Sequence, residues 1–381
     1  MPTLKGISWD HPRGFAPMEA TALEYKKKNT EVEIIWDKRP LQAFADRPIE
    51  EMAYEYDLMV IDHPHVGEAS RKELLIEFDK AEKFKNDLSE LAINSVGLSH
   101  KSYEFNNHQY ALAIDAAAPV AAYRPGSLED IPDTFEEVIK LAENSKVILA
   151  IKPVDSISYF NSIAANIGYP INKNENEFMD KQIGLTILKL MKKLSDLVPM
   201  ECLSMNPINV LDYMSANEDK LYCPILYGYS NYSREGFRKN LIKFTNIPSF
   251  NEEKNNCKGS QIGGTGLAIS SKSKNKEVAL DYAFYVASEI CQKDLFYFSG
   301  GQPSHISAWK DQNINIDCNN FFEDTLDTLE KAWLRPRYDG YMYFQDVGGT
   351  IINNYLSSGE SEISVFDNLT KEFEKSFYVN K

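Results

Sequence analysis

The sequence lacks the signatures that would assign a chemistry at once. Its five cysteines are widely spaced and no CxxC pair occurs, so neither a zinc site nor a disulfide framework is indicated, and spacing leaves a single disulfide open. The HExxH metalloprotease motif and the Gly-x-Ser-x-Gly pattern of serine hydrolases are absent. No apolar run approaches the roughly 18 residues that a membrane helix needs. These absences leave no motif to carry an enzyme reaction.

Positive charge is also scarce. The 41 lysines and arginines stand against 56 aspartates and glutamates, a formal charge of −15, which argues against nucleic acid or an anionic membrane as the main partner. The 381 residues, 43% hydrophobic and 25% charged, are typical of a globular protein and suffice for two domains. No signal peptide follows Met1, so a cytoplasmic protein and an exported protein supplied without its leader are both open.

What is present is an alternation of strand and helix signals. Strands are expected at 4–9, 32–39 and 57–64, with helices at 17–29 and 49–56. This βαβαβ order predicts parallel strands, right-handed crossovers and helices on both faces of the sheet.

The α/β pattern continues beyond residue 110. The segment 110–126 predicts two short strands broken by Pro119, and 134–145 predicts a helix. A further strand is expected at 146–153, and a long amphipathic helix at 178–198. The predicted fold class is therefore α/β throughout.

Polar residues gather where two of the predicted strands end. Trp9, His11 and Arg13 follow the first strand, and Asp62 and His63 follow the third. The carboxyl ends of parallel strands line the ligand crevice of an open α/β sheet, so these residues are candidates for binding. The His-Pro-His spacing after Asp62 is poor for chelation, so no metal is expected. An enzyme that uses His11, His63 and Asp62 as acid–base groups is the alternative.

The segment 335–346 is dense in aromatic and cationic residues. Arg335 and Arg337 have the chemistry to hold a carboxylate bidentately, or to tie this part of the chain to acidic neighbours, and the sequence leaves both readings open.

A Gly-rich stretch precedes another predicted helix at "GGTGLAISSKSKNKEVALDYAFYVAS" (263–288). Its glycines match neither the Walker pattern nor the dinucleotide fingerprint, because they come before a strand-like segment. Together with "SGGQPSHISAW" (299–309), the stretch resembles the extracellular solute-binding proteins of ABC importers, in the large group that includes sugar binders. "YDLMVIDHP", "PDTFEEVIKLAENS" and "SYFNSIAANIG" occur in the order that this family shows.

The resemblance implies a two-lobed clamshell, each lobe a mostly parallel sheet flanked by helices. One lobe would comprise 1–115 and 260–308, and the other 116–259 and 309–381, with hinge crossings near 115, 260 and 308. Such a protein is not an enzyme, needs no cofactor, and works as a monomer in the periplasm or outside the cell. It closes over a small solute, and ABC permease subunits recognise the closed form.

The resemblance also assigns site residues by position. Trp9 and Tyr229 would stack on the ligand, Asp155, Asn206 and Gln302 would hold hydroxyls, and Arg13 and Arg335 would hold any acidic group. The full set expected to bind is Trp9, His11, Arg13, Asp62, His63, Asp155, Tyr159, Asn206, Tyr229, Gly264, Gln302, His305 and Arg335. A carbohydrate is favoured over an organic acid. The alternative is an enzyme, or a cytoplasmic homologue that binds an anionic metabolite with the same residues.

Overall fold

The computed structural model describes residues 2–40, 48–251 and 253–380. The chain divides into two compact units, which we call unit 1 (Met1–Ala117 and Gly263–Asn315) and unit 2 (Ala118–Ile262 and Ile316–Lys381). The α/β fold class is confirmed. The lobe boundaries expected from the sequence, and the idea that the crossings act as hinges, stay predictions.

Unit 1 contains a five-stranded sheet with strand order β2-β1-β3-β10-β6. β1 pairs in parallel with both β2 and β3, as predicted, whereas β10 runs antiparallel to its neighbours β3 and β6. The elements of unit 1 are β1 (Thr3–Trp9), α1 (Ala16–Lys28), β2 (Glu33–Arg39), α3 (Ile49–Glu55), β3 (Leu58–Ile61), η1 (His63–His65), α4 (Val66–Arg71), α5 (Lys85–Asn94), β4 (Glu104–Phe105), β5 (His108–Gln109), β6 (Leu112–Ala117), β10 (Gly263–Ile269), α10 (Lys276–Ala287), α11 (Glu289–Cys291) and α12 (Ile306–Trp309), and α13 (Gln312–Asp317) spans the last boundary.

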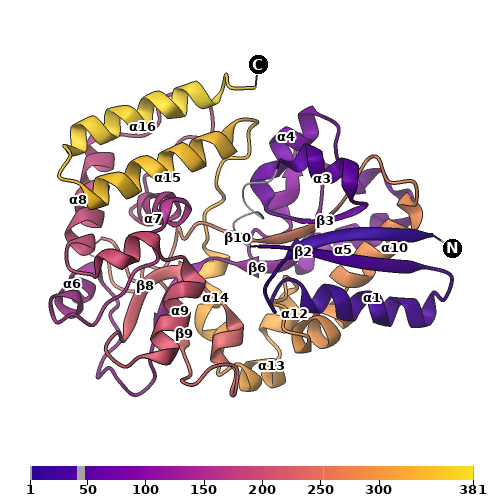
Figure 1. The fold of residues 1–381 in the computed structure, drawn as a ribbon, viewed down its shortest axis with the longest axis horizontal. Helices are drawn as coiled ribbons and strands as arrows, with labels where there is room; N and C mark the ends of the chain where they lie inside the picture. Colours follow the sequence, from indigo (N-terminus) through magenta and orange to yellow (C-terminus); the bar gives the residue numbers. More distant parts are fainter. Residues whose placement is uncertain (1, 41–47, 252, 381) are drawn as a thin grey trace. The chain divides into compact units, whose positions relative to one another are not determined.

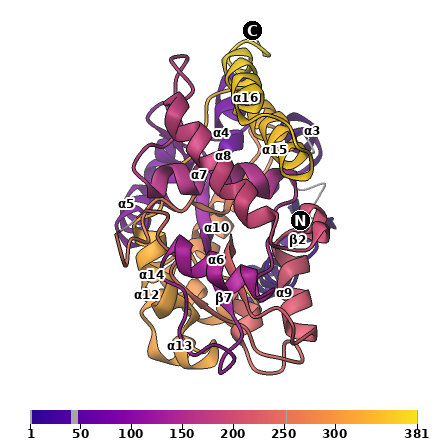
Figure 2. The same ribbon diagram turned by 90° about the vertical axis from the view of Figure 1, so that its left-hand side faces the viewer.

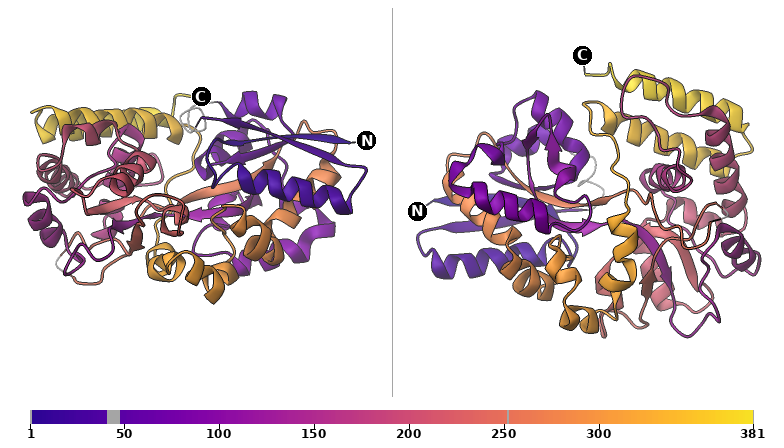
Figure 3. Two further views of the ribbon diagram at one scale, coloured as in Figure 1. Left: turned by 60° about the horizontal axis from the view of Figure 1, so that its bottom comes forward. Right: turned by 180° about the vertical axis from the view of Figure 1, so that it is seen from behind.

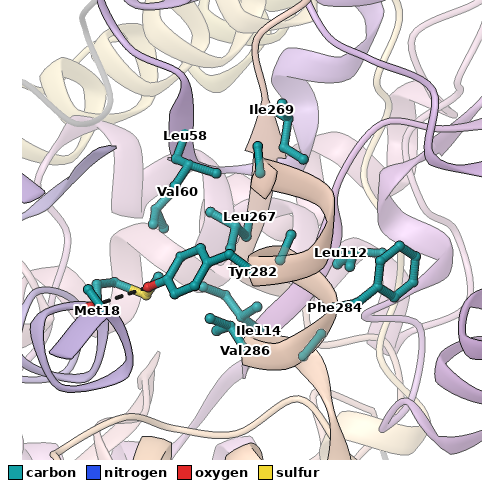
Figure 4. Packing of buried hydrophobic residues seen from close by; sticks show 14 of the residues in the cluster. Met18, Leu58, Val60, Leu112, Ile114, Leu267, Ile269, Tyr282, Phe284 and Val286 are labelled. Atoms are coloured by element: carbon teal, nitrogen blue, oxygen red, sulfur yellow. Dashed lines mark hydrogen bonds between the residues drawn. The ribbon is translucent and has the colours of Figure 1, made fainter. Parts of the chain in front are cut away.

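Helices cover both faces of this sheet. Successive residues of a strand point to opposite faces, so an apolar strand such as β3 contributes side chains to a core on each face. In β3, Leu58 and Val60 pack into the core beneath α1 and α10, while Met59 and Ile61 pack beneath α3 and α4. Figure 1 shows the two helix layers around the strands. Figure 4 shows the first core, in which the Tyr282 hydroxyl donates to the Met18 carbonyl oxygen at 3.3 Å.

Unit 2 has a three-stranded sheet of order β8-β7-β9, in which both pairings are antiparallel. The expectation of a mostly parallel sheet is therefore wrong for this unit. Its elements are β7 (Pro119–Tyr123), α6 (Phe135–Glu143), α7 (Pro153–Asn166), α8 (Lys181–Ser195), η5 (Met200–Ser204), α9 (Pro207–Ala216), β8 (Tyr222–Tyr227), η6 (Ser230–Ser233), β9 (Lys243–Thr245), α14 (Phe321–Glu330), α15 (Tyr341–Ser357) and α16 (Glu362–Ser376).

The strand predicted at 146–153 is reduced to one parallel bridge between Val147 and Tyr222. The amide of Ile148 donates to the Tyr222 carbonyl oxygen, but those of Leu149 and Ile151 donate to the Sγ and the carbonyl oxygen of Cys202 in η5. Because the amides of this segment are divided between β8 and a helical turn, no continuous ladder forms.

Helices α7, α8, α15 and α16 pack together in unit 2, and Figures 2 and 3 show α15 and α16 running side by side. Phe178, in the segment before α8, packs against Phe160 of α7 and against Phe344, Phe366 and Phe373 of α15 and α16. The contact between α7 and α15 depends on Gly349, where a Cβ atom would come 2.3 Å from the Pro153 carbonyl oxygen.

Candidate functional site

The polar residues predicted from unit 1 come together mainly at one edge of its sheet. β1 and β3 are parallel in register, with Gly6 beside Leu58, so Trp9 and Asp62 leave the sheet at the same edge. β6 is antiparallel to β10, which is antiparallel to β3, so β6 also ends at this edge, after Asp115. We call this the carboxyl edge of unit 1. It is where open α/β sheets bind ligands.

At the carboxyl edge, the turn after β1 folds over Trp9. The Trp9 side chain is buried, and its ring lies so close to Gly14 that a Cβ atom there would come within 2.2 Å of it. The Ser8 hydroxyl donates to the Gly14 carbonyl oxygen at 3.0 Å, and His11 Nδ1 accepts from the Arg13 amide at 3.0 Å. The stacking role of Trp9 stays a prediction, and in this arrangement one face of its ring is covered.

Arg13 is buried and pairs with Asp115. Its Nε and Nη2 donate to the two carboxylate oxygens of Asp115 at 2.7 and 2.6 Å. The positive charge of Arg13, which was expected to hold an acidic ligand, is therefore neutralised by Asp115 within unit 1. Asp115 was not among the predicted residues, although a single charge within the apolar run 110–122 was a signal that could have identified it.

Asp62 and His63 begin the short helix η1. Asp62 Oδ1 accepts from the His63 amide at 2.9 Å and so caps the helix. The His63 side chain is 0% exposed and lies edge-on to Tyr103, whose hydroxyl donates to the Ile61 carbonyl oxygen. An acid–base role for His63 would therefore require unit 1 to open around the imidazole.

Gly264 and Gln302 hold the last residues of β6. Gly264 has φ +90°, and a Cβ atom there would come 2.3 Å from the Asp115 carbonyl oxygen, so only glycine fits this close approach. Gln302 Nε2 donates to the Ala116 carbonyl oxygen at 2.8 Å, and the Ala116 amide donates to the Gln302 carbonyl oxygen.

The structure places His305 away from the carboxyl edge. Pro303 bridges to Asp115 and His305 bridges to Ser95, so the chain has turned back toward the start of β6. His305 lines a cavity of about 10 Å³, together with Leu91, Ser95, His100, Ala113, Ala287 and Ser304. Burial lowers the pKa of His305 and lowers the pKa of His100 to about 4, so both rings are held neutral.

In unit 2, the predicted residues Asp155 and Tyr159 lie one turn apart on helix α7. Asp155 Oδ2 and the Tyr159 hydroxyl are buried, and neither has a hydrogen-bond partner among the described residues. Burial raises the pKa of Asp155 to about 8, against the attraction of Lys152, and raises the pKa of Tyr159 well above its ordinary value. Two unsatisfied polar groups on one helix face mark a place where a polar ligand or water would bind.

Other α7 side chains form hydrogen bonds with Gln261, a residue that sequence reasoning missed. Its Nε2 donates to the hydroxyls of Ser158 and Tyr227 at 3.2 and 3.1 Å, and its Oε1 accepts from Asn161 Nδ2 at 2.8 Å. The Gln261 amide donates to the Ser162 hydroxyl at 3.0 Å. This network fixes the segment that leads into β10.

The three remaining predicted residues have structural partners in unit 2. Asn206 caps α9, since its Oδ1 accepts from the Asn209 amide at 2.9 Å. Arg335 is buried and donates to Gln345 Oε1 at 2.6 Å. Tyr229 is buried edge-on to Tyr232. Their ligand-binding roles stay predictions.

Within the described residues, no group of three or more histidine, cysteine, aspartate or glutamate side chains is placed to hold a metal ion. All five cysteines are buried and free. In the described part of the chain, none of the helices combines the length and apolar character that crossing a membrane requires.

Comparison with solved structures identifies the fold. Similar structures include maltose-bound MalE3 of T. maritima, with a TM-score of 0.83, 14% identity and coverage of 98% of this chain and 99% of that one. An ABC transporter solute-binding protein of Thermotoga lettingae TMO bound with α-D-tagatose gives a TM-score of 0.81 at 15% identity and covers 99% and 100%. One from Agrobacterium radiobacter K84 in complex with ribitol gives 0.77 at 17% identity and covers 98% of each chain.

The chain has the fold of carbohydrate ABC solute-binding proteins. The similarity extends over nearly the whole of both chains in each comparison, although identity is low. No family model matches the sequence, and no curated protein matches it significantly.

Proposed function

We propose that this protein is the solute-binding component of an ABC-type importer and that it binds a neutral, hydroxyl-rich solute such as a sugar or polyol. The observation that carries the proposal is the fold shared over nearly the full length with proteins that hold maltose, tagatose and ribitol. In this role the protein has no catalytic turnover and no cofactor, acts as a monomer outside the cytoplasmic membrane, and is recognised by permease subunits.

The preference for a neutral solute over an organic acid rests on charge. Of the two arginines expected to hold an acidic group, Arg13 already forms a bidentate pair with buried Asp115. An anion held there would compete with that carboxylate for the guanidinium and would leave a buried charge unmatched, which is costly. The unsatisfied groups of Asp155 and Tyr159 instead suit ligand hydroxyls, which both donate and accept hydrogen bonds.

The test is a binding panel measured by thermal shift and then by calorimetry. Maltose, D-tagatose, ribitol and related neutral compounds are compared with gluconate, galacturonate and citrate. A binder of the native state raises Tm by mass action, so a neutral hit with no acidic hit supports the proposal. Binding of acids alone would overturn the neutral assignment, and no binding in either class would overturn the function.

A tryptophan pair sharpens the test. If Trp9 contacts the solute, Trp9→Phe removes the fluorescence change seen on binding. Trp36→Phe is the matched control, because Trp36 lies on β2 against Gly6 and Tyr282 in the core of unit 1. It should keep the change. Loss of the signal in the control alone would remove Trp9 from the site.

A further inference from the structure

The pairing of β10 with β6 is irregular at the carboxyl edge of unit 1. Thr265 pairs with Asp115 of β6, but the register shifts between Thr265 and Gly266. The extra residue is Ile114 of β6, and pairing resumes between Gly266 and Ala113. Bulges of this kind are frequent beside binding sites. At Gly264 and Gly266 a Cβ atom would collide with the Asp115 carbonyl oxygen and with the Tyr103 ring, at 2.3 and 2.7 Å. Thr265 is therefore the one residue of the segment 263–266 that has a side chain.

The Thr265 hydroxyl differs from those of the other buried threonines. Four threonines in the described ranges are buried: Thr21, Thr265, Thr325 and Thr328. Thr21 donates to the Met18 carbonyl oxygen at 3.1 Å, Thr325 to that of Phe321 at 2.7 Å, and Thr328 to Asn246 Oδ1 at 2.8 Å. Thr265 is 7% exposed, and its Oγ1 has no hydrogen-bond partner within the described parts of the chain. A buried hydroxyl without a hydrogen-bond partner costs free energy. We therefore expect a bound group to form a hydrogen bond with Thr265 Oγ1.

We propose that Thr265 is a ligand-binding residue of unit 1, whose hydroxyl forms a hydrogen bond with a hydroxyl group of the bound solute. The inference rests on the proposed solute-binding function and adds a residue that the sequence analysis did not single out. Its chemistry suits the position. Asp115, the strand partner of Thr265, already neutralises the charge of Arg13. The Thr265 hydroxyl is uncharged and can both donate and accept a hydrogen bond, as a solute hydroxyl requires.

The proposal predicts opposite effects on stability and on affinity. Thr265→Val keeps the shape of the side chain and removes the hydroxyl. If the Thr265 hydroxyl bonds only to the solute, the ligand-free Thr265→Val protein should have the same Tm as the wild type or a higher one. Its Kd for the neutral solute should rise about tenfold or more. Thr265→Ser restores the hydroxyl and should bind within about threefold of the wild type. Thr325→Val is the matched control: it breaks a hydrogen bond within α14, so it should lower Tm and leave Kd unchanged.

The experiment measures Tm without ligand and Kd by calorimetry for the four proteins, with the best neutral compound of the panel. A rise in Kd for Thr265→Val with Tm maintained, and recovery in Thr265→Ser, supports the proposal. An unchanged Kd overturns it, and a fall in Tm with unchanged Kd assigns the hydroxyl to a structural water instead. If the wild type binds but Thr265→Val binds equally well, only this inference fails. If the wild type binds no neutral compound, the proposed function fails and this inference falls with it.

Discussion

At the carboxyl edge of unit 1, the predicted polar side chains bond mostly to Asp115 or to the backbone, whereas in unit 2 the polar side chains of α7 differ from one another. Arg13, His11, Asp62 and Gln302 each have a partner that shapes a turn or holds a strand end. On α7, the Ser158 hydroxyl and Asn161 Nδ2 bond to Gln261, while Asp155 Oδ2, the Tyr159 hydroxyl and Asn161 Oδ1 are buried without hydrogen-bond partners in the described structure.

The difference separates two tasks that sequence reasoning merges. A polar residue beside a strand end either builds the site or binds the ligand, and only its satisfied or unsatisfied hydrogen bonds tell which. In unit 1, Arg13, Asp62 and Gln302 bond to groups of the protein, and Thr265, which the sequence analysis did not predict, is the residue that we propose for the ligand. In unit 2, Asp155 and Tyr159 have unsatisfied polar atoms on one face of α7, and their ligand-binding roles stay predictions.

The largest effect should come from breaking the Arg13–Asp115 pair. Asp115→Asn leaves a buried guanidinium without its counter-charge, so we expect a loss of about 3–5 kcal/mol in the free energy of unfolding, measured by urea denaturation. The matched control is Glu24→Gln, which breaks the exposed pair with Lys27 and should change stability far less, because solvent screens exposed ion pairs. Similar small losses in both variants would show that the pair does not anchor the edge.

The next largest loss of stability should come from a substitution at Gly264, whose backbone lies close to the Asp115 carbonyl oxygen. Gly264→Ala forces a side chain into a left-handed conformation and against the Asp115 carbonyl oxygen, so we expect a loss of about 3 kcal/mol or more. Gly126→Ala is the control, since Gly126 also has positive φ, at +72°, but open space around the Cβ position. It should cost only about 1–2 kcal/mol. Equal losses in thermal unfolding would rule out the steric contribution.

A pH-dependent effect should come from Asp155. Its pKa is raised to about 8 in the folded state, so the native protein keeps a proton that the unfolded chain releases. The contribution of Asp155 to stability is therefore complete below pH 4, falls as pH rises, and is lost above pH 8. Because one oxygen is buried and the residue as a whole is partly exposed, we expect a fall of about 1–3 kcal/mol.

The measurement is the difference in unfolding free energy between wild type and Asp155→Asn from pH 4 to 9. Taking the difference removes the opposite contribution of His100, whose pKa is lowered to about 4, so that its stabilisation is lost as pH falls below 6.5. A difference that stays flat across this range would mean that the Asp155 carboxyl is not held in its protonated form.

The smallest effect should come from the Tyr159 hydroxyl. Because this group is buried without a described partner, Tyr159→Phe should leave ligand-free stability unchanged or raise it by up to about 1 kcal/mol. Tyr232→Phe is the control within unit 2, because its hydroxyl donates to Asp212 Oδ1 at 2.7 Å, and it should lose about 1–2 kcal/mol. A comparable loss for Tyr159→Phe in chemical denaturation would place a structural partner at its hydroxyl.

Prediction from sequence succeeded where the signal was local. The helices at 17–29 and 134–145, and the two strands around Pro119, are confirmed as α1, α6, β6 and β7. Strand 146–153 failed because its amides are shared between β8 and η5, a division that depends on Cys202, some fifty residues further along the chain. The antiparallel sheet of unit 2 was missed because strand direction is not encoded in periodicity.

By itself, the sequence determined the α/β order of the elements and the alternation that gives β3 two buried faces. It also determined that Trp9 and Asp62 lie at the same edge of the sheet. These features follow from the residue pattern and from the direction of the chain. Only the tertiary structure decided which polar groups are satisfied. Arg13 meets Asp115 102 residues away, and Asn161 meets Gln261 100 residues away, while Thr265, between two glycines, meets no described partner. A hydrogen bond requires two groups in contact, and contacts of this range exist only once the chain has folded.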